Sequence, residues 1–240
     1  MEIYGTTTYE EVGYKVAYLG DTDGDGQQDV GITSIDYADT GALHVMTGLP
    51  DDGSYAVTDV CQAISSTTTA LGIGEDVAPM GDIDGDGYDD FALGAYGDAE
   101  GGKFAGAVYI VKGPPSALST IEDSFAKWTG TEKYQYASKV SGNADMDGDG
   151  NVDLAIGSFP VGIDSLAGTA WIIRGPFEDG HHSLADADAA FTGESLGDAA
   201  GSSVAMLADA NGDGYSDLVV GAVELDDASG AAYLILGSPF

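Results

Sequence analysis

The nine residues Asp82-Ile-Asp-Gly-Asp-Gly-Tyr-Asp-Asp90 reveal how the whole sequence is organised. Related stretches occupy Asp21–Asp29, Asp145–Asp153 and Asp209–Asp217, and successive starts are 61, 63 and 64 residues apart. One such stretch carries little information, but four at nearly constant spacing define an internal repeat. The sequence therefore predicts four copies of one unit, which cover approximately residues 1–60, 61–123, 124–187 and 188–240.

Short apolar runs accompany every acidic stretch. A valine lies five residues before each first aspartate, as Val77 does before Asp82. The run Asp90-Phe-Ala-Leu-Gly94 follows the stretch, and a variable loop then leads to Gly106-Ala-Val-Tyr-Ile-Val-Lys-Gly113. Such runs are too short for helices and are bounded by Gly and Asp, so we predict that they are β-strands.

A weaker fourth strand is expected in each unit, at Ala63–Ser65, Phe125–Thr129 and Ala189–Thr192. Ile3 lies 18 residues before Asp21, just as Ile64 lies 18 before Asp82, so the sequence begins on one more such strand. We therefore predict an all-β fold in which residues 1–240 form a single β-propeller domain of four four-stranded blades. The N-terminal strand is expected to complete the last blade and so remove an open sheet edge. Three assemblies remain open: a self-closed ring, two chains paired into an eight-bladed ring, or part of a larger propeller.

The acidic stretches have the composition of calcium sites. Calcium takes six to eight oxygen ligands, and acidic side chains at positions 1, 3, 5 and 9 of the stretch, with the backbone carbonyl at position 7, can surround one ion. Glycines at positions 4 and 6 permit the tight turn. We expect about four Ca²⁺ per chain. The predicted ligands are Asp21, Asp23, Asp25, Gln27 and Asp29; Asp82, Asp84, Asp86, Tyr88 and Asp90; Asp145, Asp147, Asp149, Asn151 and Asp153; and Asp209, Asn211, Asp213, Tyr215 and Asp217.

An EF-hand and an ordinary turn are the two other interpretations of these stretches. An EF-hand needs a bidentate Glu at position 12, where this sequence has Ile32, Leu93, Ile156 and Val220, so an EF-hand is excluded. Asp-Gly clusters also form ordinary turns without metal, although four matched ligand sets argue against that reading. Magnesium retains its waters and avoids all-protein cages, which favours calcium.

The charge fits bound cations. The chain has 41 Asp and Glu against 7 Lys and Arg, a formal net charge of −34. Four calcium ions would reduce this to −26, so much of the acidity remains as solvated surface. Nucleic acid is an unsuitable partner because phosphate binding needs clustered basic residues. The apolar runs are too short to span a membrane.

The repeat resembles the FG-GAP repeat of integrin α-subunit propellers and their bacterial relatives. The resemblance covers essentially the whole sequence, and the acidic loop is its most specific part, whereas the naming dipeptides are degenerate, as at Ile73-Gly74. Integrin-type propellers have seven blades, and here there are four repeats. The resemblance implies a calcium-stiffened scaffold for extracellular recognition or adhesion, with a possible extracellular protein or glycan ligand. The count of four repeats leaves open a monomer or a homodimer.

We predict an extracellular or cell-surface protein that is not an enzyme. The first residues lack a basic and apolar leader, so a secreted form would need a signal peptide outside this sequence. No catalytic residue is predicted: His44 sits at the strand position of Tyr109, and Cys61 has no evident base partner. The loops Tyr96–Ala105 and Phe159–Ala167 are candidate recognition loops, although their rings are expected to cover neighbouring blades. The alternatives are a carbohydrate-binding lectin and a part of a polysaccharide-acting enzyme.

Overall fold

The computed structural model describes residues 1–8, 10–35, 40–68, 71–118, 120–160, 163, 165–224 and 229–239. Strands dominate this part of the chain, and helical segments are limited to single turns. The strands are β1 (Glu2–Tyr4), β2 (Val16–Gly20), β3 (Asp29–Ser34), β4 (Ala42–Met46), β5 (Ser54–Ala56), β6 (Gln62–Ser65), β7 (Ile73–Gly81), β8 (Asp90–Ala95), β9 (Ala107–Val111), β10 (Ala126–Thr129), β11 (Ala137–Ala144), β12 (Asp153–Ser158), β13 (Thr169–Ile173), β14 (Gly180–Ser183), β15 (Ala189–Thr192), β16 (Ala200–Leu207), β17 (Asp217–Ala222) and β18 (Ala231–Ile235). The helical turns are α1 (Val57–Val60), η2 (Pro115–Ala117), η3 (Ile121–Asp123) and η4 (Leu184–Asp186).

The strands form four successive antiparallel sheets. The first sheet has the order β2-β3-β4-β6, the second β7-β8-β9-β10, the third β11-β12-β13-β15 and the fourth β16-β17-β18. Strand β14 joins the outer edge of the second sheet in parallel with β10, and β1 pairs in parallel with β5. The predicted strands, including the weaker fourth strand of the first three repeats, are confirmed.

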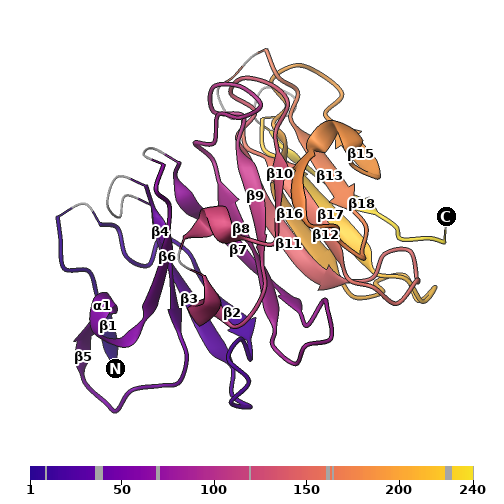
Figure 1. The fold of residues 1–240 in the computed structure, drawn as a ribbon. Helices are drawn as coiled ribbons and strands as arrows, with labels where there is room; N and C mark the ends of the chain where they lie inside the picture. Colours follow the sequence, from indigo (N-terminus) through magenta and orange to yellow (C-terminus); the bar gives the residue numbers. More distant parts are fainter. Residues whose placement is uncertain are drawn as a thin grey trace.

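Neighbouring sheets pack face to face along an arc (Figure 1). Apolar side chains fill the three spaces between them, as shown by Leu43 with Leu93, Ile110 with Ile156, and Ile172 with Val220. Alternate residues of a strand point to opposite faces, so each central strand contributes to the spaces on both sides. This explains why strands such as β8 and β12 are buried at every position.

Close backbone approach between sheets requires glycine at the end of the second strand. A Cβ built at Gly94 would lie 2.0 Å from the carbonyl oxygen of Ser138 in the third sheet. At Gly157 it would lie 2.2 Å from the carbonyl oxygen of Gly201 in the fourth. Any side chain here would push neighbouring sheets apart.

The prediction that the N-terminal strand completes the last blade is wrong for the single chain. Strand β1 pairs with β5, and the fourth sheet has three strands in the described part of the chain. Figure 1 shows the reason: the two termini lie at opposite ends of the arc, so β1 cannot reach β18.

Helices in the described residues fall short of the length and apolar content that a membrane span requires.

Candidate metal centres

Each acidic stretch is the loop between the first and second strands of its sheet. In the second sheet the loop joins β7 to β8, and its glycines Gly85 and Gly87 have φ of +77° and +95°. The other three loops also place both glycines at positive φ. These values lie in a region where other residues are strained, so the loop conformation depends on glycine at positions 4 and 6.

The first aspartate of each loop organises the turn. Asp82 Oδ1 accepts a hydrogen bond from the N–H of Gly85 at 2.7 Å, and Oδ2 accepts one from Gly87 at 2.9 Å. The same pair of bonds recurs at Asp21, Asp145 and Asp209. Each first aspartate therefore has both oxygens fixed at the centre of its loop, where an ion would lie.

The third and fifth positions extend this pattern. Asp84 Oδ1 accepts the N–H of Asp86 at 3.1 Å, and Asp86 Oδ1 accepts the N–H of Tyr88 at 3.0 Å. Three groups of acidic residues bring ligand oxygens within 4.8 Å of one another: Asp21, Asp23 and Asp29; Asp82, Asp84 and Asp86; and Asp145, Asp147 and Asp153. The backbone thus gathers predicted ligands into compact oxygen clusters in three of the four loops.

The fourth loop differs because Asn211 replaces an aspartate. Its amide Nδ2 donates to Asp213 Oδ2 at 2.8 Å, and its Oδ1 accepts the N–H of Asp213 at 2.9 Å. The Asp209 bonds are the same as in the other loops, so the turn is preserved with one carboxylate fewer. A neutral oxygen at this position is compatible with calcium.

The ninth aspartate is buried in every loop. Asp90 Oδ2 accepts the N–H of Ile83 at 2.9 Å, and Oδ1 accepts that of Gly113 at 2.8 Å, which ties the loop to the end of β9. Burial raises the pKa of Asp90, and likewise that of Asp153, to about 6. In the first loop, Asp29 Oδ1 is buried without a hydrogen-bond partner in the described structure. A cation beside these carboxylates would offset the cost of burying them, so the residues present fit a metal ion.

Basic side chains approach two of the loops. Lys112 Nζ lies 3.0 Å from Asp84 Oδ2, and Arg174 Nη1 lies 3.3 Å from Asp147 Oδ2. The hydrogen bond from Lys112 lowers the pKa of Asp84. Both bases follow the third strand of their own sheet, so they contribute positive charge to the second and third loops.

Neighbouring loops are joined in pairs, which the sequence reasoning did not predict. The N–H of Asp89 donates to the carbonyl of Asp21 at 2.8 Å, and Asp89 Oδ2 accepts the N–H of Asp21 at 2.7 Å. The Tyr88 ring covers the first loop so closely that a Cβ at Gly24 would lie 2.8 Å from Tyr88 Cε1. The third and fourth loops repeat this arrangement through Tyr215 and Gly148. The available signal was the tyrosine at position 7, which occurs in the second and fourth loops alone.

The comparisons with known proteins agree with this repeat structure. A family model described as FG-GAP repeat matches residues 76–111 and 200–235. The second and fourth repeats of this chain are FG-GAP repeats. The resemblance inferred from the acidic loops is thereby confirmed. The two matched FG-GAP repeats are also the two whose loops carry a tyrosine at position 7.

Similar proteins include integrin α subunits. Integrin alpha-4 of Xenopus laevis is 36% identical over 95 residues, which cover 38% of this chain and 9% of that protein. Integrin alpha-PS2 of Drosophila melanogaster is 30% identical over 174 residues, 65% of this chain and 12% of that protein. Integrin alpha-6 of Gallus gallus is 29% identical over 153 residues, 61% of this chain and 13% of that protein. The aligned parts of this chain thus span about a tenth of each relative's length.

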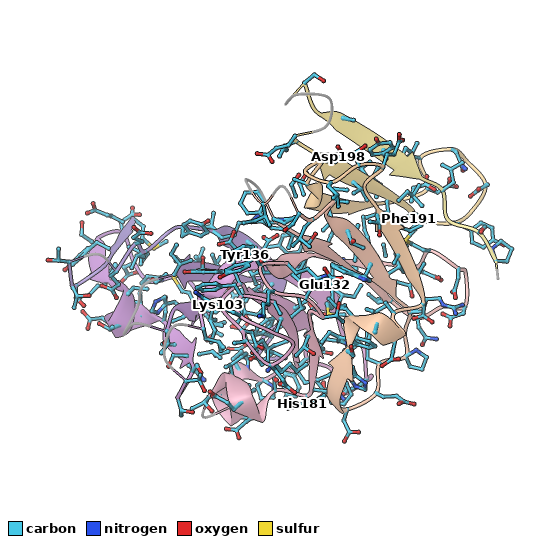
Figure 2. The ribbon with its side chains drawn as sticks, turned by 90° about the horizontal axis from the view of Figure 1, so that it is seen from above. Lys103, Glu132, Tyr136, His181, Phe191 and Asp198 are labelled. Atoms are coloured by element: carbon cyan, nitrogen blue, oxygen red, sulfur yellow. The ribbon has the colours of Figure 1, made fainter. Side chains whose placement is uncertain are left out.

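The predicted recognition loops bring aromatic rings together between the second and third sheets. The Phe104 ring stacks on Tyr136 with centroids 5.6 Å apart, and Tyr96 lies 6.4 Å from the same ring. Figure 2 shows Tyr136 and Lys103 near each other. Tyr96 and Phe104 thus cover the neighbouring third sheet, as expected. Phe159 is 39% exposed with Lys139 Nζ 4.8 Å above its ring, and residues 161, 162 and 164 of its loop lie outside the described residues.

The remaining candidates for chemistry are accounted for by packing. His44 is fully buried and its Nε2 lies 3.0 Å from Ser34 Oγ, as expected for a side chain that replaces a packed tyrosine. His182 stacks on Trp128 with ring centroids 4.6 Å apart. Burial raises the pKa of the Cys61 thiol to about 11, which disfavours a reactive thiolate.

Proposed function

We propose that this chain is a calcium-binding β-propeller scaffold for extracellular recognition or adhesion, in which calcium stiffens the hairpin loops. The observation that carries the proposal is the repeated oxygen cluster, because three loops bring acidic ligands within 4.8 Å of one another. The FG-GAP repeats and the integrin relatives support the same reading.

About four Ca²⁺ would bind, one to each loop, through side chains at positions 1, 3, 5 and 9 and the backbone carbonyl at position 7. The position 7 residues are Gln27, Tyr88, Asn151 and Tyr215. Hard oxygen donors in this number suit calcium. Without a cation, each cluster holds like charges at short range, so metal binding would stabilise the folded loops more than the unfolded chain.

The four sheets support a domain of four blades that spans residues 1–240. Each sheet contains one acidic loop between its first two strands, which supports one blade for each repeat. The fourth strand of each of the first three sheets comes from the start of the next repeat. Such radial repeats present loops on two opposite sides of a ring, which separates a stiffened side from a side available for ligands.

We place the extracellular protein or glycan ligand at an open hollow that is lined by aromatic side chains. Tyr14, Tyr96, Tyr136 and Phe159 line an open hollow, and the Tyr14 hydroxyl donates to Glu75 at 3.1 Å inside it. Aromatic faces beside a carboxylate can stack on sugars or hold a basic side chain. A carbohydrate-binding lectin is therefore the second candidate function. We propose an extracellular or cell-surface location, a non-enzymatic role, and no nucleic-acid partner.

Calcium binding is tested by titration of the metal-free chain, followed by isothermal calorimetry and native mass spectrometry. We expect about four ions per chain and a matching rise in thermal stability. Binding of magnesium in equal number and affinity would contradict the calcium assignment. An unchanged melting temperature after addition of chelator would contradict metal binding by the acidic loops.

A further inference from the structure

The partner of β1 shows which strand of a blade it represents. Strand β1 pairs in parallel with β5 and places Ile3 opposite Tyr55. Strand β10, the fourth strand of the second sheet, pairs in parallel with β14 and places Trp128 opposite His182. Both β5 and β14 immediately precede a helical turn, α1 or η4. Strand β1 therefore occupies the place of a fourth strand that belongs to a sheet ahead of the first one.

The helical turns confirm this equivalence in register. Val57 in α1 lies two residues after Tyr55, and Leu184 in η4 lies two residues after His182. Val57 is fully buried and Leu184 is 2% exposed. The two parallel pairs thus match residue for residue.

The two ends of the arc carry complementary strand edges. Strand β10 lies between β9 and β14, with both edges paired. In the described residues, β1 has β5 as its single strand partner, and β18 is the edge strand of a three-stranded sheet. Strand β1 therefore lacks an equivalent of β9, and β18 lacks an equivalent of β10.

The first and fourth sheets each expose apolar side chains whose equivalents are buried between neighbouring sheets elsewhere in the arc. Val16 of the first sheet is 62% exposed, whereas its equivalents Val77 and Val140 are 4% and 5% exposed. Leu234 of the fourth sheet is 54% exposed, whereas the equivalent Ile110 is fully buried. Each end thus exposes the apolar face that a neighbouring sheet covers elsewhere in the chain.

An apolar groove runs beside β18. It has a volume of about 440 Å³ and lies between Phe191 of β15 and Leu234 of β18. Figure 2 shows Phe191 next to the strands of the fourth sheet. In the preceding spaces, Ile121 and Leu184 from the segments before the fourth strands pack into the clusters between sheets. The groove has the position and lining that suit an added strand.

We propose that a second copy of this chain binds here, with β1 of each copy pairing in antiparallel fashion with β18 of the other. Three internal pairings set the register: Ile64 opposite Leu43, Trp128 opposite Val108, and Phe191 opposite Ala170. Their equivalents place Ile3 opposite Ala232. A two-fold pair makes this contact twice and closes eight sheets into one ring.

The second copy is favoured over closure within one chain because the termini lie at opposite ends of the arc (Figure 1). The contact also continues a series of three internal interfaces, because both ends carry the apolar positions that are buried in those interfaces. A closed ring protects edge strands from uncontrolled pairing. This inference goes beyond the proposed function and uses none of the acidic loops, so its failure would leave calcium binding intact.

The association is tested first by sedimentation of the 240-residue chain in calcium. We expect a dimer at about 100 μM, well above the dissociation constant of a typical apolar interface of standard size. Leu234→Asp should weaken association on the order of 100-fold, because the charge would be buried at both contacts. Leu196→Asp is the matched control, since Leu196 is 70% exposed and lies beside Leu166 of the loop between β12 and β13 in the third sheet. A monomer with the unmodified sequence would overturn the proposal.

The register is tested by cysteine cross-linking in a Cys61→Ser background. Ile3→Cys with Ala232→Cys should form a disulfide between two chains, because directly opposed residues bring their Cβ atoms to about 5 Å. Tyr4→Cys with Ala232→Cys is the control, since a slip of one residue places the side chains on opposite faces. A disulfide within one chain would show self-closure and overturn the second copy. Equal cross-linking of both pairs, or of neither, would overturn the proposed register.

Discussion

The substitution Asp86→Ala separates a calcium site from an ordinary turn. Asp86 contributes to the cluster with Asp82 and Asp84, yet its carboxylate accepts one exposed hydrogen bond, from the N–H of Tyr88. Without calcium its removal loses little and also relieves repulsion between neighbouring carboxylates. We therefore expect a nearly unchanged melting temperature in chelator and a clear loss of stability in calcium.

The magnitude follows from binding linkage. Extracellular-type calcium modules have dissociation constants on the order of 10⁻⁴–10⁻³ M. At about 10 mM calcium, one occupied site then adds roughly 1.4–2.7 kcal/mol to the free energy of unfolding. For a domain of this size, 1 kcal/mol shifts the melting temperature by about 2–4 °C. Loss of the second loop's ion should therefore lower the melting temperature in calcium by roughly 3–11 °C.

The assay is thermal unfolding followed by tryptophan fluorescence, in calcium and in chelator, for the unmodified chain and two variants. Asp179→Ala is the matched control, because Asp179 is an exposed aspartate outside the four loops. It should change neither transition. If Asp86→Ala lost the same stability in chelator as in calcium, the loops would be turns and the linkage argument would be refuted.

Three further predictions concern the packing and the coupling of the loops. Burial lowers the pKa of His44, although the charge of Glu10 opposes this effect. The unfolded chain therefore binds a proton at this imidazole more readily than the folded chain does, and the free energy of unfolding falls as the pH drops below about 6.5. His44→Tyr should reduce this loss in urea unfolding between about pH 7.5 and 5.5, and an identical pH dependence would contradict it. Gly94→Ala should destabilise the chain by roughly 2–3 kcal/mol in urea, because its Cβ would lie 2.0 Å from a backbone carbonyl of the third sheet; an unchanged urea midpoint would refute the close approach. Tyr88→Ala should weaken calcium binding at the first loop but not at the third, as followed by calorimetry, and equal weakening at all loops would argue against pairing.

The contacts between paired loops predict coupling between the proposed calcium sites. Asp89 and Tyr88 of the second loop contact the first loop, so under the proposed calcium binding an ion that ordered one loop would also restrict the other. Coupling of this kind appears as cooperative filling within a pair of loops. The third and fourth loops repeat the contact through Tyr215, so the same coupling is expected in a second pair of loops.

Local sequence determined the strands, the acidic loops and the repeat. The spacing of the four loops and the apolar runs around them reflect short-range rules, because strand and turn chemistry depend on neighbouring residues. The loop glycines and the first aspartate of each loop were therefore recognised without a structure. The likeness of His44 to Tyr109 was also visible, since equivalent positions in a repeat pack alike.

Tertiary structure alone decided which distant edges meet. The fourth-strand character of β1 was readable from the position of Ile3, but its partner β5 depends on how the first sheet folds back beside it. The contact of Tyr88 with Gly24 likewise joins residues 64 positions apart and follows from the angle between sheets. Periodicity in a sequence specifies the face of a strand, whereas the curvature of the arc, which leaves Val16 and Leu234 uncovered, arises from packing across many residues.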